Sequence, residues 1–115
     1  MKKLLTLLFV FTSFSVLNAQ TDIAESDVKT AGEKFKAGNY DEALSIYLDL
    51  LVEDPRNMEY NYRIGVCYLN TNINKAKAIP YLELVTRQPG YEPDAMYLLG
   101  RAYHFAYRFD DAIIL

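Results

Sequence analysis

Side chains that commonly carry catalysis are scarce in this sequence of 115 residues, which has one cysteine, Cys67, and one histidine, His104. A Cys–His nucleophilic pair also needs a third group that orients the histidine, and no motif marks one. Zinc sites use several histidine and cysteine ligands, which the chain does not have. It also lacks a glycine-rich phosphate loop and a serine nucleophile motif. We therefore predict no catalytic residue, no metal site and no cofactor, and we interpret Cys67 as a buried small apolar residue.

Two acidic pairs, Asp41-Glu42 and Asp110-Asp111, are the remaining candidates for proton-transfer chemistry. They fall at equivalent places in two similar stretches, "GNYDEALSIY" at 38–47 and "AYRFDDAIIL" at 106–115. Acidic residues are favourable in the first turn of a helix, where the backbone N–H groups carry partial positive charge. We interpret both pairs as helix N-terminal charges, and the similarity of the two stretches indicates an internal repeat.

Small residues recur with a period near 34, which predicts how the elements around these side chains are arranged. One series, spaced by 34 and 35 residues, is Ala31-Gly65-Gly100. The other, spaced by 35 and 34 residues, is Ala43-Ala78-Ala112. Two tyrosines at 35 residues' distance are Tyr68 and Tyr103. Small side chains at such points let two helices of one unit approach closely, so the pattern favours stacked helical hairpins.

These landmarks resemble the tetratricopeptide repeat family, whose units carry an aromatic, leucine-glycine and tyrosine on one helix and alanine, an aromatic and proline on the next. The matching residues are Thr30-Ala31, Ala43, Tyr47 and Pro55 in the first unit, Asn61, Ile64-Gly65, Tyr68, Ala78 and Leu82 in the second, and Met96, Leu99-Gly100, Tyr103 and Ala112 in the third. The resemblance implies an all-α, right-handed α-solenoid over residues 24–115. Its helix-turn-helix units would cover about 24–57, 58–92 and an incomplete 93–115.

Local signals predict where each helix begins and ends. Gly38-Asn39 and Asp54-Pro55 are helix ends, Asn74 is a helix cap, and Pro93 suits the first position of a helix. Pro80 conflicts with a regular helix from Asn74, so we expect either a kink or a later start. The expected helices are about 24–37, 40–53, 58–69, 74–87, 93–107 and a sixth that opens at 109.

The resemblance implies two sets of functional positions. Residues that pack the repeats together are Ala31, Ala43, Tyr47, Gly65, Tyr68, Ala78, Leu82, Gly100, Tyr103 and Ala112. Residues that line a concave groove for a protein or peptide partner are Tyr62, Val66, Leu69, Tyr97, Arg101 and His104, with Val28, Gly32 and Phe35 at the matching places of the first unit. Val28 and Gly32 stand where some family members use lysine and asparagine to grip a C-terminal carboxylate, so we predict no such clamp.

The first twenty residues have the pattern of a secretory signal peptide. Lys2 and Lys3 precede an apolar run from Leu4 to Leu17, and cleavage is expected after Ala19 or Gln20. The run is 14 residues long, which is shorter than the roughly 20 that a membrane-spanning helix needs. We therefore predict an exported protein of the periplasm or the outer membrane.

Removal of Lys2 and Lys3 would lower the 12 basic residues to 10 against 15 acidic residues, a net charge of −5. A polybasic surface for nucleic acid is therefore unsupported. With its signal peptide, the repeat region resembles the N-terminal part of bacterial outer-membrane-associated proteins that end in an OmpA-like domain. That resemblance implies a noncatalytic envelope scaffold, with peptidoglycan or outer-membrane association only through domains beyond Leu115.

Two other functions stay open at this point. The repeats could recruit partners for a larger enzyme, or they could form a structural subunit that assembles with further copies. Helical repeats bury their apolar faces only against neighbours. The last unit ends at Leu115, three apolar residues after Ala112 and before its second helix is complete. We therefore expect the sequence to be the N-terminal part of a longer protein.

Overall fold

The computed structural model describes residues 24–114, with side chains described as far as Tyr107. The predicted signal peptide, residues 1–20, lies outside the described residues. Within the described range the chain is helical and has no strand, which confirms the predicted all-α fold. No helix in that range is both long enough and apolar enough to cross a membrane.

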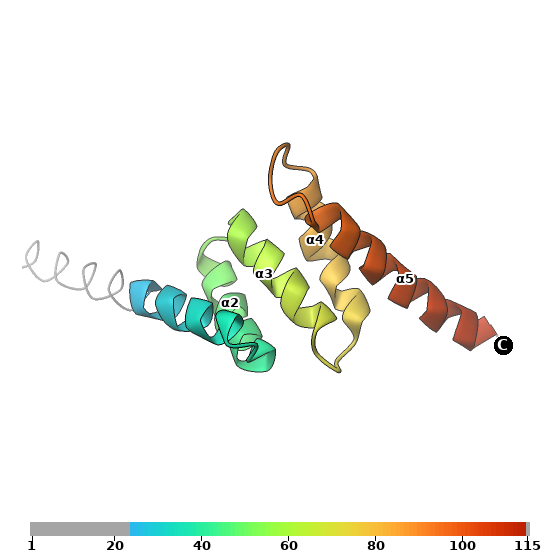
Figure 1. Ribbon diagram of the computed structural model, residues 1–115, viewed down its shortest axis with the longest axis horizontal. Helices are drawn as coiled ribbons and strands as arrows, with labels where there is room; N and C mark the ends of the chain where they lie inside the picture. Colours follow the sequence, from blue (N-terminus) through green and yellow to red (C-terminus); the bar gives the residue numbers. More distant parts are fainter. Residues whose placement is uncertain (1–23, 115) are drawn as a thin grey trace, which may run out of the picture.

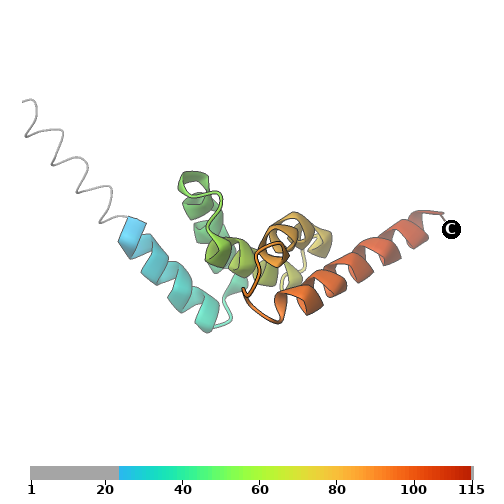
Figure 2. The same ribbon diagram turned by 90° about the horizontal axis from the view of Figure 1, so that it is seen from above.

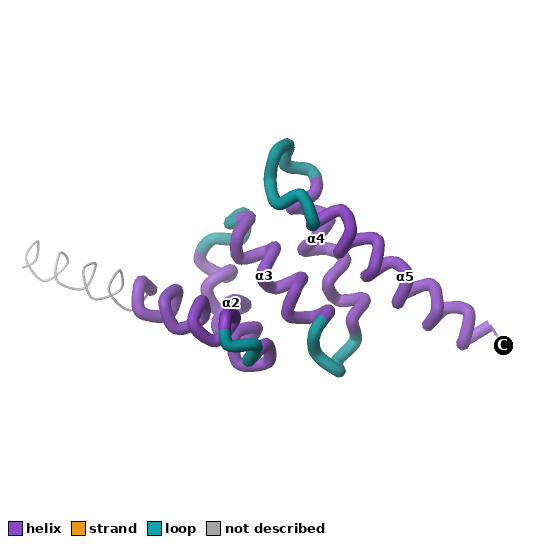
Figure 3. Tube along the Cα trace, in the orientation of Figure 1, coloured by secondary structure: helices purple, strands orange, loops and turns teal. Residues whose placement is uncertain are grey.

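The helices follow one another as antiparallel hairpins (Figures 1 and 3). A helix over residues 24–36 comes first. The elements after it are α2 (Tyr40–Glu53), α3 (Met58–Leu69), the 3-10 helix η1 (Lys75–Ala78), α4 (Ile79–Thr86) and α5 (Ala95–Ile114). Packing joins α2 to α3, α3 to η1 and α4, and α4 to α5. Each helix therefore contacts mainly its neighbours in the sequence, as stacked repeats do.

The turn between the first two helices is set by Gly38, whose φ of 79° lies in the left-handed region. The N–H of Asn39 donates to the carbonyl of Lys34 at 2.9 Å, and the N–H of Gly38 donates to that of Phe35 at 3.1 Å. This pair of bonds is the Schellman arrangement that satisfies carbonyls at the end of a helix. The predicted helix stop at Gly38-Asn39 is confirmed.

The conflict at Pro80 is resolved by a late helix start. Residues Lys75–Ala78 form one 3-10 turn, and the regular helix α4 begins at Ile79. Pro80 therefore lies in the first turn, where its missing N–H breaks no helical hydrogen bond. The side chain of Asn74 accepts a hydrogen bond from the N–H of Ala76 at 3.0 Å, so Asn74 is a cap as expected.

Two predictions for the third unit are wrong. The helix begins at Ala95 and not at Pro93, and it continues to Ile114 without the predicted turn and sixth helix. The place equivalent to Gly38-Asn39 is occupied here by Tyr107-Arg108, which has no residue suited to a positive φ. Nothing there stops the helix, and the C-terminal half of α5 extends away from the other helices (Figures 1 and 2).

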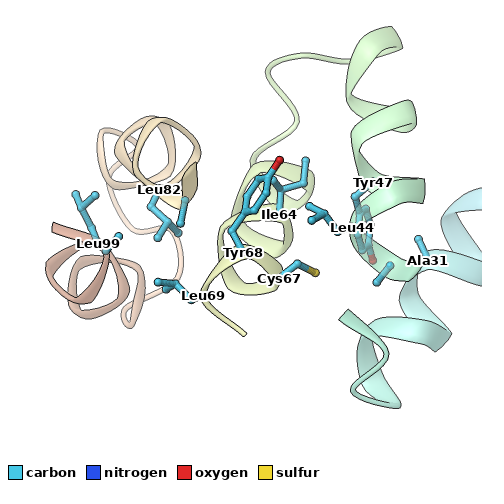
Figure 4. Packing of buried hydrophobic residues seen from close by; sticks show 12 residues of the cluster. Ala31, Leu44, Tyr47, Ile64, Cys67, Tyr68, Leu69, Leu82 and Leu99 are labelled. Carbon is cyan, nitrogen blue, oxygen red and sulfur yellow. The ribbon is translucent and has the colours of Figure 1, made fainter. Parts of the chain in front are cut away.

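One continuous apolar core runs between the helices (Figure 4). Its closest approach is between Gly65 on α3 and Leu82 on α4. A Cβ atom added to Gly65 would lie 2.5 Å from Cδ2 of Leu82, so only glycine fits at this point without rearrangement. The absence of a side chain on α3 is therefore what lets α4 pack so closely against it.

Candidate functional site: a surface lined by the opening helices of the repeats

The packing positions of the first two units all lie in the core. Ala31, Ala43, Tyr47, Gly65, Tyr68, Ala78 and Leu82 are buried. The third unit differs and corrects the prediction. Gly100 is exposed, with nothing within 4 Å of an added Cβ, and Tyr103 is 37% exposed. Gly100 does not pack a repeat here, because no second helix folds back onto α5 among the described residues. Tyr103 contacts the preceding unit only from the surface, where its hydroxyl donates a hydrogen bond to Glu83 of α4. The side chain of Ala112 lies outside the described residues.

In the first unit the predicted groove positions are partly covered by Arg63 of α3. Its guanidinium lies over the ring of Phe35 at 5.0 Å from the centroid, and a Cβ on Gly32 would be 3.4 Å from Nη1 of Arg63. Arg63 also pairs with Glu59 at 2.8 Å. Val28 is exposed near the start of the helix. Because Arg63 already covers Phe35, this unit presents little free aromatic surface.

In the second unit Tyr62 contacts the loop that leads to α5. Its hydroxyl lies 2.9 and 2.8 Å from the two carboxylate oxygens of Asp94 and donates to that carboxylate. Its ring meets Tyr91 edge-on, with centroids 6.4 Å apart. Burial, and then the hydrogen bond to Asp94, raise the pKa of Tyr62 above its usual value. Tyr62 therefore helps to position the start of the third unit.

The other two groove residues of the second unit differ in accessibility. Val66 is half-buried and keeps some exposed surface. Leu69 is 1% exposed and belongs to the core, pointing from α3 toward α4 and α5 (Figure 4). Leu69 cannot contact a partner, and its assignment to the groove is wrong. The reason is that α3 packs against η1, α4 and α5, and Leu69 belongs to the core between these elements.

The predicted groove residues of the third unit do come together. A hollow of about 350 Å³ on α5 is lined by Tyr97, Gly100, Arg101, His104 and Phe105. Tyr97 is 68% exposed, His104 is exposed and Arg101 is half-buried. These side chains lie on one face because they are three or four residues apart along a helix. We call this the α5 hollow.

Several residues of this surface were missed by sequence reasoning. Phe105 lines the α5 hollow, and the ammonium of Lys75 on η1 lies 4.7 Å from the centroid of its ring. Asp94 binds Tyr62 across 32 residues of sequence. That separation is close to one repeat period, which is the signal that could have pointed to the pair. Nothing in the sequence marked Lys75.

The described residues offer no arrangement for catalysis by a metal or a thiolate. No group of three or more His, Cys, Asp or Glu side chains among them is placed to hold a metal ion. Cys67 is buried, whereas His104 is exposed on α5. Burial raises the pKa of the Cys67 thiol to about 12, although Arg63 lowers it. The thiol is therefore protonated at neutral pH, and a thiolate is what a nucleophilic cysteine requires.

Helical hairpins stacked through small residues, with side chains free on their opening helices, define a helical-repeat protein of the kind that binds other proteins. The chain belongs to the tetratricopeptide repeat family, whose sequence profile matches residues 29–92, more than half of its length. Domains of this family generally mediate protein–protein interactions and are typically noncatalytic. Comparison with curated proteins and with solved structures finds no significant match.

Proposed function

We propose that this chain is a noncatalytic scaffold that binds a segment of another protein along the opening helices of its second and third repeats. The observation that carries the proposal is the α5 hollow, where Tyr97 and Phe105 present aromatic surface beside Arg101 and His104. Rigid aromatic side chains supply large contact area at low entropic cost, and arginine adds directional hydrogen bonds. Val66 on α3 would extend the same surface toward the second unit.

Quantitative copurification tests the proposal. The tagged full chain is expressed in its host, and copurified proteins are compared among wild type, Tyr97→Ala and Val52→Ala. Val52 is the matched control because it is an apolar side chain on α2 that is 75% exposed, similar to Tyr97. We expect Tyr97→Ala to lose a specific partner that Val52→Ala retains. Equal partner recovery from both variants would exclude the hollow as the binding surface.

We further propose that the protein is exported and works in the bacterial cell envelope, in the periplasm or at the outer membrane. Support for export comes from the positively charged start and the apolar run of residues 4–17. N-terminal sequencing of the protein recovered from cells tests it. A mature chain that begins at Gln20 or Thr21 is the expected result, and an intact Met1 on cytoplasmic protein would contradict it.

Self-assembly is a second candidate, favoured by the exposed side of α5. Met96, Tyr103 and Tyr107 are large apolar side chains exposed there, and unpaired repeat faces tend to be covered by a neighbour. Sedimentation of the full chain over a range of concentrations distinguishes self-assembly from binding of another protein. A monomer throughout would exclude self-assembly, whereas concentration-dependent association would support it.

A further inference from the structure

We propose that the α5 hollow recognises an acidic segment, in which an apolar side chain enters the hollow and neighbouring carboxylates meet Arg101. The inference rests on the proposed binding function and adds the chemical class of the partner. The hollow has a volume of about 350 Å³, within the range of about 300–1,000 Å³ that ligand pockets occupy. One or two side chains of a peptide would fill it.

The lining carries cationic and neutral groups but no carboxylate. Arg101 and His104 are the polar side chains that line it, beside Tyr97, Gly100 and Phe105. Lys75 adds a second permanent charge at the edge, since its ammonium lies over the ring of Phe105. An anion approaching the hollow therefore meets positive charge and no opposing carboxylate on its lining.

Arg101 and Lys75 are among the cations of the described chain that form no ion pair, whereas three others are paired. Lys34 pairs with Glu42 at 2.7 Å, and Arg63 pairs with Glu59 at 2.8 Å. Arg87 lies 4.0 Å from Glu83. No ion pair of the described side chains involves Arg101 or Lys75. Their charges remain available for a carboxylate supplied by a partner.

The net charge of the chain also affects how an acidic segment approaches it. The whole chain carries a net charge of −3, so an acidic segment is repelled by the molecule on average. Arg101 in the lining and Lys75 over Phe105 supply local positive charge that attracts such a segment to the hollow. Arginine then fixes its orientation, because the planar guanidinium matches a carboxylate with two parallel hydrogen bonds.

A panel of labelled peptides tests the inference with the full chain. Three matched sets carry a central leucine or phenylalanine flanked by Asp and Glu, by Asn and Gln, or by Lys. Binding is measured by fluorescence anisotropy for wild type, Arg101→Gln, Arg87→Gln and Tyr97→Ala. Arg87→Gln is the control, because it makes the same chemical change at an exposed position outside the hollow.

We expect the acidic set to bind about tenfold more tightly than the amide set, and Arg101→Gln to remove most of that preference. Arg87→Gln should retain it. His104→Gln provides a second variant, at an exposed position, and circular dichroism checks that Arg101→Gln and His104→Gln are both folded. A smaller loss is expected for His104→Gln.

Other outcomes overturn the inference in distinguishable ways. Equal binding of acidic and amide sets that is lost in Tyr97→Ala rejects the charge preference and leaves the binding proposal standing. Tightest binding of the lysine set also rejects it. If Arg101→Gln dissociates a dimer of the chain, the occupant is a second copy. Absence of binding by all three sets rejects both this inference and the peptide-binding role of the hollow.

Discussion

The guanidinium of Arg63 on α3 donates a hydrogen bond of 2.5 Å to the hydroxyl of Tyr47 on α2. Tyr47 is 1% exposed, so its hydroxyl depends on this partner. Because Arg63 also covers Phe35 of the first helix, one side chain joins three successive helices. The boundary between the first two units is therefore held by a polar contact inside an otherwise apolar interface.

Tyr47→Phe should lower the free energy of unfolding by about 1–2 kcal/mol, because it removes the acceptor and leaves an N–H of Arg63 without that partner. Urea denaturation followed by circular dichroism measures it. Tyr97→Phe is the matched control, since that hydroxyl is on an exposed side chain, and it should change stability by less than about 0.5 kcal/mol. Equal effects of the two substitutions would contradict the role given to the Arg63–Tyr47 bond.

Gly65→Ala and Gly100→Ala should change stability in opposite directions. The added Cβ at residue 65 would lie 2.5 Å from Leu82, and such overpacking costs about 1–3 kcal/mol. At residue 100 the added Cβ meets nothing within 4 Å, so alanine should stabilise the helix by about 0.5–1 kcal/mol. Thermal and urea unfolding of both variants measure this difference.

A double mutant separates the clash from other effects at residue 65. Combined with Leu82→Ala, Gly65→Ala should cost less than the sum of the two single changes, because the methyl group then occupies space that Leu82 has left. Simple additivity would show that the cost at residue 65 does not arise from contact with Leu82.

Stability should fall as the pH rises above about 10, the usual pKa of tyrosine. Burial and the bond to Asp94 keep Tyr62 protonated in the folded state, so between its unfolded and folded pKa values only the unfolded chain loses this proton. The contribution is complete below the unfolded pKa and is lost as the pH rises toward the folded pKa. Tyr62→Phe should reduce the slope of unfolding free energy against pH, and an unchanged slope would contradict it.

Cys67 should react slowly with thiol reagents in the folded protein. Burial raises its pKa to about 12 and also blocks access, so labelling at pH 8 should be at least about a hundredfold slower than in the urea-unfolded chain. Absorbance of the released chromophore of a disulfide reagent measures the rate. Rapid labelling of the folded protein would indicate an accessible thiol that the structure does not have.

Helix ends proved predictable where a residue has a local reason to end a helix. Gly38 adopts a positive φ and Asn74 supplies a cap, and both act through their own backbone neighbourhood. The turn expected after Tyr107 was inferred only from the similarity of two stretches. It is wrong because Tyr107-Arg108 lacks the glycine that makes the first copy turn.

Exposure of individual side chains was harder to predict, because it depends on which helices pack nearby. Gly65 and Gly100 occupy equivalent repeat positions, yet only Gly65 has a second helix against it. Leu69 was assigned to the groove by its repeat position and is buried by the elements that follow it. The bridging position of Arg63 joins three successive helices, and no local pattern distinguishes it from a surface arginine.

Photo-crosslinking from Tyr97 in living cells is the most direct test of whether this chain binds a protein segment through α5. A benzophenone amino acid replaces Tyr97 in one variant and Val52 in another, and both sites are exposed. We expect a specific crosslinked partner from residue 97 that is absent from residue 52 and is lost when Arg101→Gln is added. The same crosslinked species from both positions, or none from residue 97, would contradict it.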